Sequence, residues 1–339
     1  MARRKQSAPR RGSLGVRPRK RASRIVPRIK SWPLIVSETP RLLAFLGYKV
    51  GMTHAIIIDD REGSPTYGRE ISVPVTIIET PPMMPLATRF YVYGSNNDLK
   101  TLTEAWIEPP KELEIHRKIA TFKPNDIDKI FKVAEEKLEE IVRISIIAAT
   151  QPKLAGGLEK KKPDLLEIVV GGGKDTSDKI EYVRKILGTQ VSISQIFREG
   201  SFVDAIGVTK GKGFQGVIKR FGVRELPRWH KHRKGSRRIG ARSPAYGAVS
   251  EAPQPGQMGY HRRTQYNLRV LMISNDPSKI NPKGGFPHYG LVKSEYIALI
   301  GTVQGPPKRP IVLRYPIRPP RIIPEVAPKI VYLSLESKV

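Results

Sequence analysis

The sequence predicts a mainly β fold built around a closed β-barrel, with an α+β insertion and two long, extended basic segments. Short runs rich in Val, Ile, Leu and aromatic residues recur between Gly, Pro and Asp in both halves of the chain. Many short strands with Gly/Pro turns are typical of a closed barrel rather than an open parallel sheet. A helix-containing stretch of nearly balanced charge separates the two halves, and Lys and Arg crowd into two stretches without hydrophobic periodicity.

The first basic segment, residues 1–33, is rich in Arg, Lys, Ser and Pro and contains no acidic side chain. It cannot bury enough apolar surface to offset its ordering entropy, so we expect disorder until a partner binds. A mitochondrial transit peptide is the alternative for such an Arg-rich N-terminus. The prolines and glycines between Pro9 and Pro27 would break the amphipathic helix of a transit peptide, and no apolar stretch of a secretory signal follows the charged start.

Eight runs are predicted to be strands: 42–52, 54–59, 73–80, 89–94, 202–209, 269–275, 295–303 and 310–315. The insertion is expected to hold helices over 126–141 and 176–187 and buried strands over 142–150 and 165–170. The expected segments are a basic N-terminal extension (1–41), a first part of the barrel (42–95), the insertion (96–190), a barrel strand (191–209), an extended basic loop (210–268) and a last part of the barrel with the C-terminal tail (269–339).

The extended basic loop (210–268), called the central loop below, holds GKGFQG near its start. In this stretch Gly211, Gly213 and Gly216 match G-x-G-x-x-G. A dinucleotide site needs this turn to open a helix and an acid about 20 residues further on. VIKRFG is a poor helix former and residues 230–242 contain no acid, so we favour a different role. The glycines would let the backbone approach phosphate closely, beside Lys210, Lys212 and Lys219.

Two further stretches of the loop mix rings and cations, ELPRWHKHRKGSRRIGAR (225–242) and GQMGYHRRTQYN (256–267). Aromatic rings and guanidinium planes stack on unpaired bases, and the cations neutralise phosphates. A solvated charged loop is the alternative, but its cations would repel one another with nothing bound. His230 and His232 as half of a metal site is a weaker alternative, because no carboxylate or thiol lies nearby.

The net charge of +29 points to a polyanionic partner, with an acidic membrane surface as the second choice. Residues 1–30 hold twelve Lys+Arg and no acid, and residues 208–270 have a net charge of +13, so these two stretches carry +25 of the total. The chain has no cysteine and no apolar run near the ~20 residues that span a bilayer. These counts favour a nucleic-acid-binding protein of a reducing compartment.

No catalytic set emerges from the sequence, and we expect neither an enzyme nor a cofactor or metal. Asp59 and Asp60 lie at a predicted turn and Asp126 and Asp128 at a helix start, where capping explains them. His54 and His116 are interpreted as structural. A nucleotide-dependent enzyme using GKGFQG and a general DNA-coating protein are the alternative functions.

Several blocks carry a specific resemblance: SAPRRGSLGVRPRKRASR (7–24), FLGYKVGMTH (45–54), VTIIETPPM (75–83), AIGVTKGKGFQGVIKRF (205–221), GQMGYHRRTQYN (256–267) and GGFPHYG (284–290). They resemble the universal family of the third large-subunit ribosomal protein. The first block and the 96–190 insertion resemble its archaeal and eukaryotic form. The resemblance implies a six-stranded translation-protein-type barrel with two extensions threading into large-subunit ribosomal RNA, an early role in assembly, and contacts with neighbouring ribosomal proteins in the cytoplasmic ribosome.

In this family the central loop approaches the peptidyl transferase centre, and the archaeal and eukaryotic form commonly carries a tryptophan at the loop tip. Here the tip reads Gly240, Ala241, Arg242, Ser243 and Pro244, so that a planar guanidinium stands in place of the ring. The candidate RNA-binding residues are Arg3, Arg4, Lys5, Arg10, Arg11, Arg17, Arg19, Lys20, Arg21, Arg24, Lys210, Lys212, Lys219, Arg220, Arg228, Trp229, His230, Lys231, His232, Arg233, Lys234, Arg237, Arg238, Arg242, Tyr260, His261, Arg262 and Arg263.

Overall fold

A computed structural model describes residues 11–119, 124–231, 253–321 and 326–336 of the chain. The chain divides into two compact units. The basic unit comprises Met1–Ser23 and Thr209–Arg262, and the main unit comprises Arg24–Val208 and Arg263–Val339. By sequence the basic unit holds 22 Lys+Arg against two acids, so 77 residues carry +20 of the net +29. The division into six segments expected from the sequence stays a prediction.

The main unit contains a seven-stranded sheet, which confirms the mainly β class. Its strands are β2 (Ala44–Ile58), β3 (Glu70–Glu79), β8 (Phe202–Val208), β11 (Arg262–Ser274), β12 (Tyr296–Ile300), β13 (Pro310–Arg314) and β14 (Ile330–Leu333). They pair in the order β13-β8-β11-β12-β3-β2-β14, and β13 also pairs with β2. Six strands therefore follow one another in a closed ring of pairings, and β14 is added at β2. Phe45, Ile297 and Val312 are fully buried in the core.

Two of the expected strands, 42–52 and 54–59, form one continuous strand, β2. The pairing register of β2 with β3 shifts between Lys49 and Gly51. Such a bulge absorbs one extra residue and bends the strand without ending it. A Cβ at Gly51 would lie 3.0 Å from Cδ1 of Phe286, so a larger residue there would require this ring to shift slightly. The two predicted runs are therefore joined in one strand that bends near Gly51.

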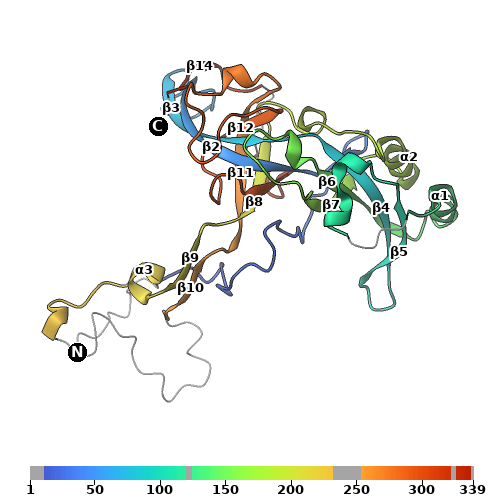
Figure 1. The fold of residues 1–339 in the computed structure, drawn as a ribbon, viewed down its shortest axis with the longest axis horizontal. Helices are drawn as coiled ribbons and strands as arrows, with labels where there is room; N and C mark the ends of the chain where they lie inside the picture. Colours follow the sequence, from blue (N-terminus) through green and yellow to red (C-terminus); the bar gives the residue numbers. More distant parts are fainter. Residues whose placement is uncertain (1–10, 120–123, 232–252, 322–325, 337–339) are drawn as a thin grey trace. The chain divides into compact units, whose positions relative to one another are not determined.

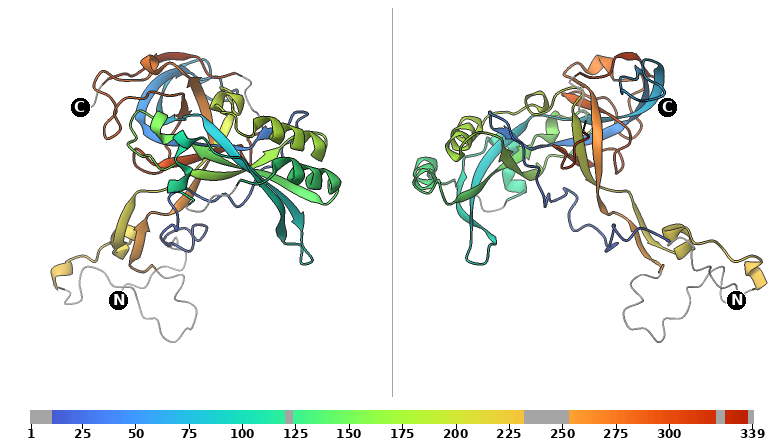
Figure 2. Two further views of the ribbon diagram at one scale, coloured as in Figure 1. Left: turned by 45° about the vertical axis from the view of Figure 1, so that its right-hand side comes forward. Right: turned by 180° about the vertical axis from the view of Figure 1, so that it is seen from behind.

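A separate five-stranded sheet with strand order β1-β7-β6-β4-β5 combines strands of the insertion with two strands from outside its expected bounds of 96–190. Its strands are β1 (Arg41–Leu42), β4 (Met83–Tyr93), β5 (Leu99–Trp106), β6 (Ile141–Thr150) and β7 (Leu165–Gly171). The expected barrel strand 89–94 belongs to this sheet and not to the ring of pairings. Helices α1 (Ile127–Glu136) and α2 (Thr176–Ile186) lie together on one face of this sheet (Figures 1 and 2). Phe90 of β4 meets Phe131 of α1 edge to face, with ring centroids 5.8 Å apart.

The first predicted helix, 126–141, is too long. Helix α1 ends at Glu136, and Ile141 begins strand β6, where it pairs with Val92. Asp126 takes the N-cap position as expected, but its side chain makes no capping hydrogen bond. The second helix matches its predicted range closely, because Asp175 and Asp178 form a capping box at its start.

The basic unit contains regular structure that the sequence pattern did not predict. A two-stranded antiparallel sheet joins β9 (Gly211–Gln215) to β10 (Gly256–Gly259), and α3 (Val217–Phe221) follows β9. The expectation that VIKRFG is a poor helix former was wrong for these five residues: Val217 is buried, and Gly222 ends the helix in the left-handed conformation. Short 3-10 helices lie at Lys111–Leu113, Ile115–Arg117, Pro152–Leu154, Ile193–Gln195, Trp229–Lys231 and Pro277–Lys279.

Candidate nucleic-acid interface

The basic unit contains the β9–β10 hairpin. The expected GKGFQG turn is instead strand β9, apart from its last residue, Gly216. The strands of the hairpin approach so closely at Gly259 that a Cβ there would lie 2.1 Å from the carbonyl oxygen of Lys210. By contrast, a Cβ at Gly213 or Gly216 would meet nothing within 4 Å. Although a helix does follow Gly216, β9 pairs antiparallel with β10 and is no part of a parallel βαβ unit. The hairpin geometry therefore argues against a dinucleotide site.

Residues 11–22 of the N-terminal segment are seated on this hairpin and on α3. The guanidinium carbon of Arg19 lies 4.2 Å from the ring centroid of Phe221, and Arg21 lies 5.4 Å from that of Tyr260. The amide of Ala22 donates to the carbonyl oxygen of Tyr260 at 2.8 Å. Cation–π contacts and backbone hydrogen bonds thus order a segment that lacks a hydrophobic pattern.

The expected disorder of residues 1–33 was therefore wrong for the described part of the segment. In the main unit, residues 24–33 also make specific contacts: Val26, Ile29 and Trp32 pack on the core, and Arg314 donates to the carbonyl oxygen of Ser31 at 2.7 Å. A few apolar residues and backbone carbonyls are sufficient to hold the segment in place, because the folded units supply the complementary donors. Sequence periodicity does not register such contacts.

Arg220, a candidate RNA contact, is hydrogen-bonded within the basic unit. Its guanidinium donates to the carbonyl oxygens of Gln257 (2.9 Å), Gln254 (2.8 Å) and Arg19 (3.4 Å). Burial, followed by the positive charge of Arg17, lowers its pKa from the usual range. One side chain thus joins α3, the approach to β10 and the N-terminal segment.

Replacing Arg220 with Ala is expected to loosen the N-terminal segment within the basic unit. Loss of its hydrogen bonds to three carbonyls should lower the free energy of local opening by about 2 kcal/mol, which is about 30-fold faster amide exchange. Hydrogen exchange at Ala22 measures this. The matched control is Ala at the exposed neighbour Lys219, which should leave Ala22 unchanged; equal exchange in the two variants would contradict the anchoring role.

The exposed cations of the basic unit remain as candidates for phosphate contact. These predicted residues are exposed: Arg11, Lys20, Arg21, Lys210, Lys212, Lys219, Arg228, His230, Lys231 and Arg262. Arg17, Arg19 and Tyr260 are half-buried, and His261 is buried, with its Nδ1 2.9 Å from the carbonyl oxygen of Lys20. In the main unit, Arg24 is exposed and Arg263 is half-buried, and burial lowers the pKa of Arg263.

The sequence analysis missed Phe214, whose side chain is 76% exposed. It lies on β9, two residues after the exposed Lys212. An exposed ring beside cations is a stacking platform for an unpaired base. Phe214 is the one large apolar residue of GKGFQG, but the sequence analysis considered only the glycines of this stretch and the lysines beside them.

Part of the predicted interface lies outside the described residues. This applies to Arg3, Arg4, Lys5, Arg10, His232, Arg233, Lys234, Arg237, Arg238 and Arg242, to the loop-tip residues Gly240, Ala241, Ser243 and Pro244, and to the side chain of Trp229. Their assignment rests on sequence and resemblance alone.

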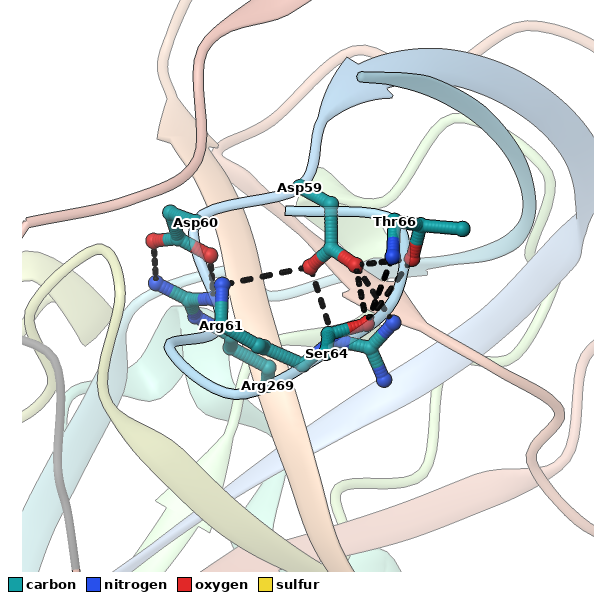
Figure 3. Close-up of polar contacts among 6 residues, drawn as sticks. All are labelled: Asp59, Asp60, Arg61, Ser64, Thr66 and Arg269. Carbon is teal, nitrogen blue, oxygen red and sulfur yellow. Dashed lines mark hydrogen bonds and ion pairs between the residues drawn. The ribbon is translucent and has the colours of Figure 1, made fainter. Parts of the chain in front are cut away.

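The adjacent carboxylates Asp59 and Asp60 are structural, as the sequence analysis interpreted them (Figure 3). Asp59 is buried and accepts hydrogen bonds from Arg61 (2.8 Å to Nε), Ser64 (3.0 Å) and Thr66 (2.5 Å). Asp60 accepts from both terminal nitrogens of Arg269, at 2.6 and 2.5 Å. The hydrogen bonds from Arg61 and Arg269 hold the pKa values of Asp59 and Asp60, respectively, below their usual range.

Acid is expected to loosen the turn that follows β2. A carboxyl whose pKa is lowered on folding stabilises the fold above its unfolded pKa, near 3.9, and this stability is lost as the pH falls through the folded pKa. The protection factors of residues 59–69, which are corrected for the pH dependence of intrinsic amide exchange, should therefore fall from about pH 5 downward. Asp60→Asn should lower these protection factors already at pH 7 and flatten their pH dependence. A variant with the same pH profile as the parent protein would contradict this account.

Among the residues that the structure describes, no group of three His, Asp or Glu side chains is arranged to hold a metal ion. No helix in that part of the chain is long and apolar enough to cross a membrane.

A mainly β unit together with a compact unit of exposed cations and an exposed ring is typical of the nucleic-acid-binding class of proteins. Residues 1–332 match the model of the family Ribosomal protein L3, and the chain belongs to this family. It is 56% identical to the large ribosomal subunit protein uL3 of Aeropyrum pernix, over all of this chain and 99% of that protein. With the same coverage, it is 54% identical to uL3 of Sulfurisphaera tokodaii and 49% identical to uL3 of Saccharolobus islandicus.

Proposed function

We propose that this chain binds large-subunit ribosomal RNA through its basic unit, while the main unit forms the folded body. As a member of its family the chain is a structural constituent of the large ribosomal subunit and not an enzyme. The observation that carries the proposal is the concentration of +20 formal charge in 77 residues, with most of the described cations exposed. A surplus of this size repels itself unless phosphates neutralise it.

The exposed cations replace counterions between RNA helices that would otherwise repel one another. Lys210, Lys212 and Lys219 supply phosphate contacts, and Phe214 stacks on a base between them. Arg220 and His261 act indirectly by holding the segment that presents Lys20 and Arg21. The predicted set thus divides into contacting and positioning residues.

The central loop has a more specific role in this proposal. On the basis of the family resemblance, its tip at 240–244 reaches toward the peptidyl transferase centre, with Arg242 providing a planar cation where relatives of this type commonly place a ring. The chemistry there belongs to the RNA. Early binding during assembly, contacts with neighbouring ribosomal proteins and a place in the cytoplasmic ribosome complete the proposal.

We also propose that the ring of paired strands is the six-stranded barrel of the translation-protein type. Its strands are β2, β3, β8, β11, β12 and β13. The support is that each strand pairs with the next and β13 returns to β2.

A competition assay tests the RNA assignment. Labelled large-subunit ribosomal RNA is bound to the full chain at a fixed salt concentration and displaced by unlabelled ribosomal RNA or duplex DNA. Structured ribosomal RNA should compete at much lower concentration than duplex DNA. Equal competition would favour the DNA-coating alternative, and tight binding of ATP or NAD by the RNA-free chain would favour a nucleotide-dependent enzyme.

A further inference from the structure

The five-stranded sheet of the main unit has one face that neither α1 nor α2 covers. Strand side chains alternate between faces, and Phe90, Ile144 and Ile168 point toward the core beneath α1 and α2. On the opposite face, polar side chains lie over the middle of the sheet, whereas Met84, Ala149 and Leu165 at one end pack with Leu113 and Ile115. Arg89 and Tyr91 of β4 therefore lie with Arg143 of β6 and Glu167 of β7, since Tyr91 pairs with Arg143. Polar residues on a sheet face require solvent or a polar partner.

Residues 24–32 line a cavity on this face. Val26, Ile29 and Trp32 pack on the core and fix the segment, while Arg24, Arg28 and Lys30 are exposed. The cavity has a volume of about 1170 Å³. Sites for small molecules measure about 300–1,000 Å³, so this space suits a stretch of polymer better than one small ligand.

The cavity is strongly cationic. Its charged lining residues are Arg24, Arg28, Lys30, Arg89, Lys118, Arg143 and Glu167, a formal net charge of +5. The one acid is engaged: the carboxylate of Glu167 accepts hydrogen bonds from Tyr91 (2.5 Å) and Ser145 (2.9 Å), and its other oxygen lies 3.6 Å from Arg89.

The pKa of Lys118 reflects the same excess of positive charge. Burial lowers its pKa, and the charges of Lys160, Lys162 and Arg24 lower it further, against the opposing effect of Asp164. An anion beside Lys118 would remove this repulsion. Arg89 also pairs with Glu104, but the cations of the lining still outnumber the two carboxylates, Glu104 and Glu167, that the ion pairs place beside them.

We propose that this cavity is a second RNA-binding site, in which backbone phosphates of ribosomal RNA lie between residues 24–32 and the open face of the sheet. The inference rests on the proposed function but adds a site in the main unit, whereas most of the net charge belongs to the basic unit. Arg143 and Arg24 supply guanidinium forks for phosphate oxygens, and Lys118 a point charge. An acidic protein segment is the competing occupant.

The salt dependence of RNA binding tests the site. The full chain with Arg24→Gln, Lys118→Gln and Arg143→Gln is compared with a control that loses the same charge on the helices, Lys129→Gln, Lys132→Gln and Lys185→Gln. Each lost phosphate contact should lower the slope of log affinity against log salt by about 0.7–0.9, so the cavity variant should lose about two to three. The control should keep the parent slope.

Equal slopes in the cavity variant and the control overturn the inference. If neutralising the cations of residues 225–242 flattens the slope in the same assay, the proposed function survives this failure. If that variant also keeps the parent slope, the proposed function fails with it.

Lysine acetylation of the unmodified chain gives a second test that does not depend on how the variants fold. Lys118 should react readily in the free chain, because its lowered pKa leaves more of the amine unprotonated. Purified large-subunit ribosomal RNA should protect Lys118 and leave Lys132 on α1 reactive. If Lys118 is protected only when ribosomal proteins are added, and not by RNA alone, the cavity holds an acidic protein segment. This result would overturn the inference.

Discussion

Replacing the cations of the central loop with Gln is expected to cause the largest loss of RNA affinity. The seven residues are Arg228, Lys231, Arg233, Lys234, Arg237, Arg238 and Arg242. If each contacts one phosphate, the slope of log affinity against log salt should fall by about five to six, because each contact contributes about 0.7–0.9. Filter binding of large-subunit ribosomal RNA between 50 and 300 mM salt, on the order of the range where such contacts weaken, measures the slope.

The control for this variant loses the same charge from the main unit. Its seven Gln substitutions fall on exposed lysines: Lys111, Lys129, Lys132, Lys137, Lys174, Lys185 and Lys279. Deletion of residues 225–242 should reproduce the effect of the loop substitutions, since the side chains and not the loop backbone supply the charge. A slope that falls equally in the control would show that net charge, rather than this loop, determines binding.

Replacing Glu79 with Ala is expected to cause the largest loss of stability. This fully buried carboxylate accepts hydrogen bonds from the amides of Gly156 (3.1 Å), Lys293 (2.8 Å) and Ser294 (2.9 Å) and from the hydroxyl of Tyr289. It therefore joins the end of β3 to two loops. Burial and the charge of Glu79 raise the pKa of Tyr289, so the phenol stays protonated and donates.

Without the carboxylate, five donors lose their acceptor in the interior, because the hydroxyl of Ser294 also donates to Glu79, at 3.0 Å. Each buried donor left unsatisfied costs about 1–3 kcal/mol, and partial rearrangement brings the expected loss to about 3–5 kcal/mol. Thermal unfolding should shift downward by roughly 10 °C. The exposed Glu62→Ala is the matched control and should change stability by less than about 0.5 kcal/mol. A Glu79→Ala chain as stable as this control would contradict the joining role.

The strands of the main unit were predictable because their amino-acid composition reflects their burial. Runs such as VPVTIIET are rich in β-branched residues and correspond to β3 within a few residues. Strand β5 was missed because LKTLTEAW is exposed over its first half and lacks a continuous apolar run. The pairing partner β4, rather than its own sequence, places β5 in the sheet.

The candidate interface was predictable in its charge but not in its internal contacts. Charge density is a property of the sequence, and it located the basic unit. The anchoring of residues 11–22 depends on single carbonyl oxygens and two ring faces, which leave no periodic trace. For the same reason, Arg220 and Lys219 look alike in sequence, although one is bonded to three carbonyl oxygens and the other is exposed.

Sedimentation of the tagged full chain from an archaeal cell extract tests the central claim most directly. If the chain is a constituent of the large subunit held by its basic unit, it should migrate with the large-subunit peak in low salt. The variant with seven neutralised loop cations should shift toward the top of the gradient at salt concentrations that leave the parent chain bound. A parent chain that stays at the top, or that follows the small subunit or the DNA, would contradict the account.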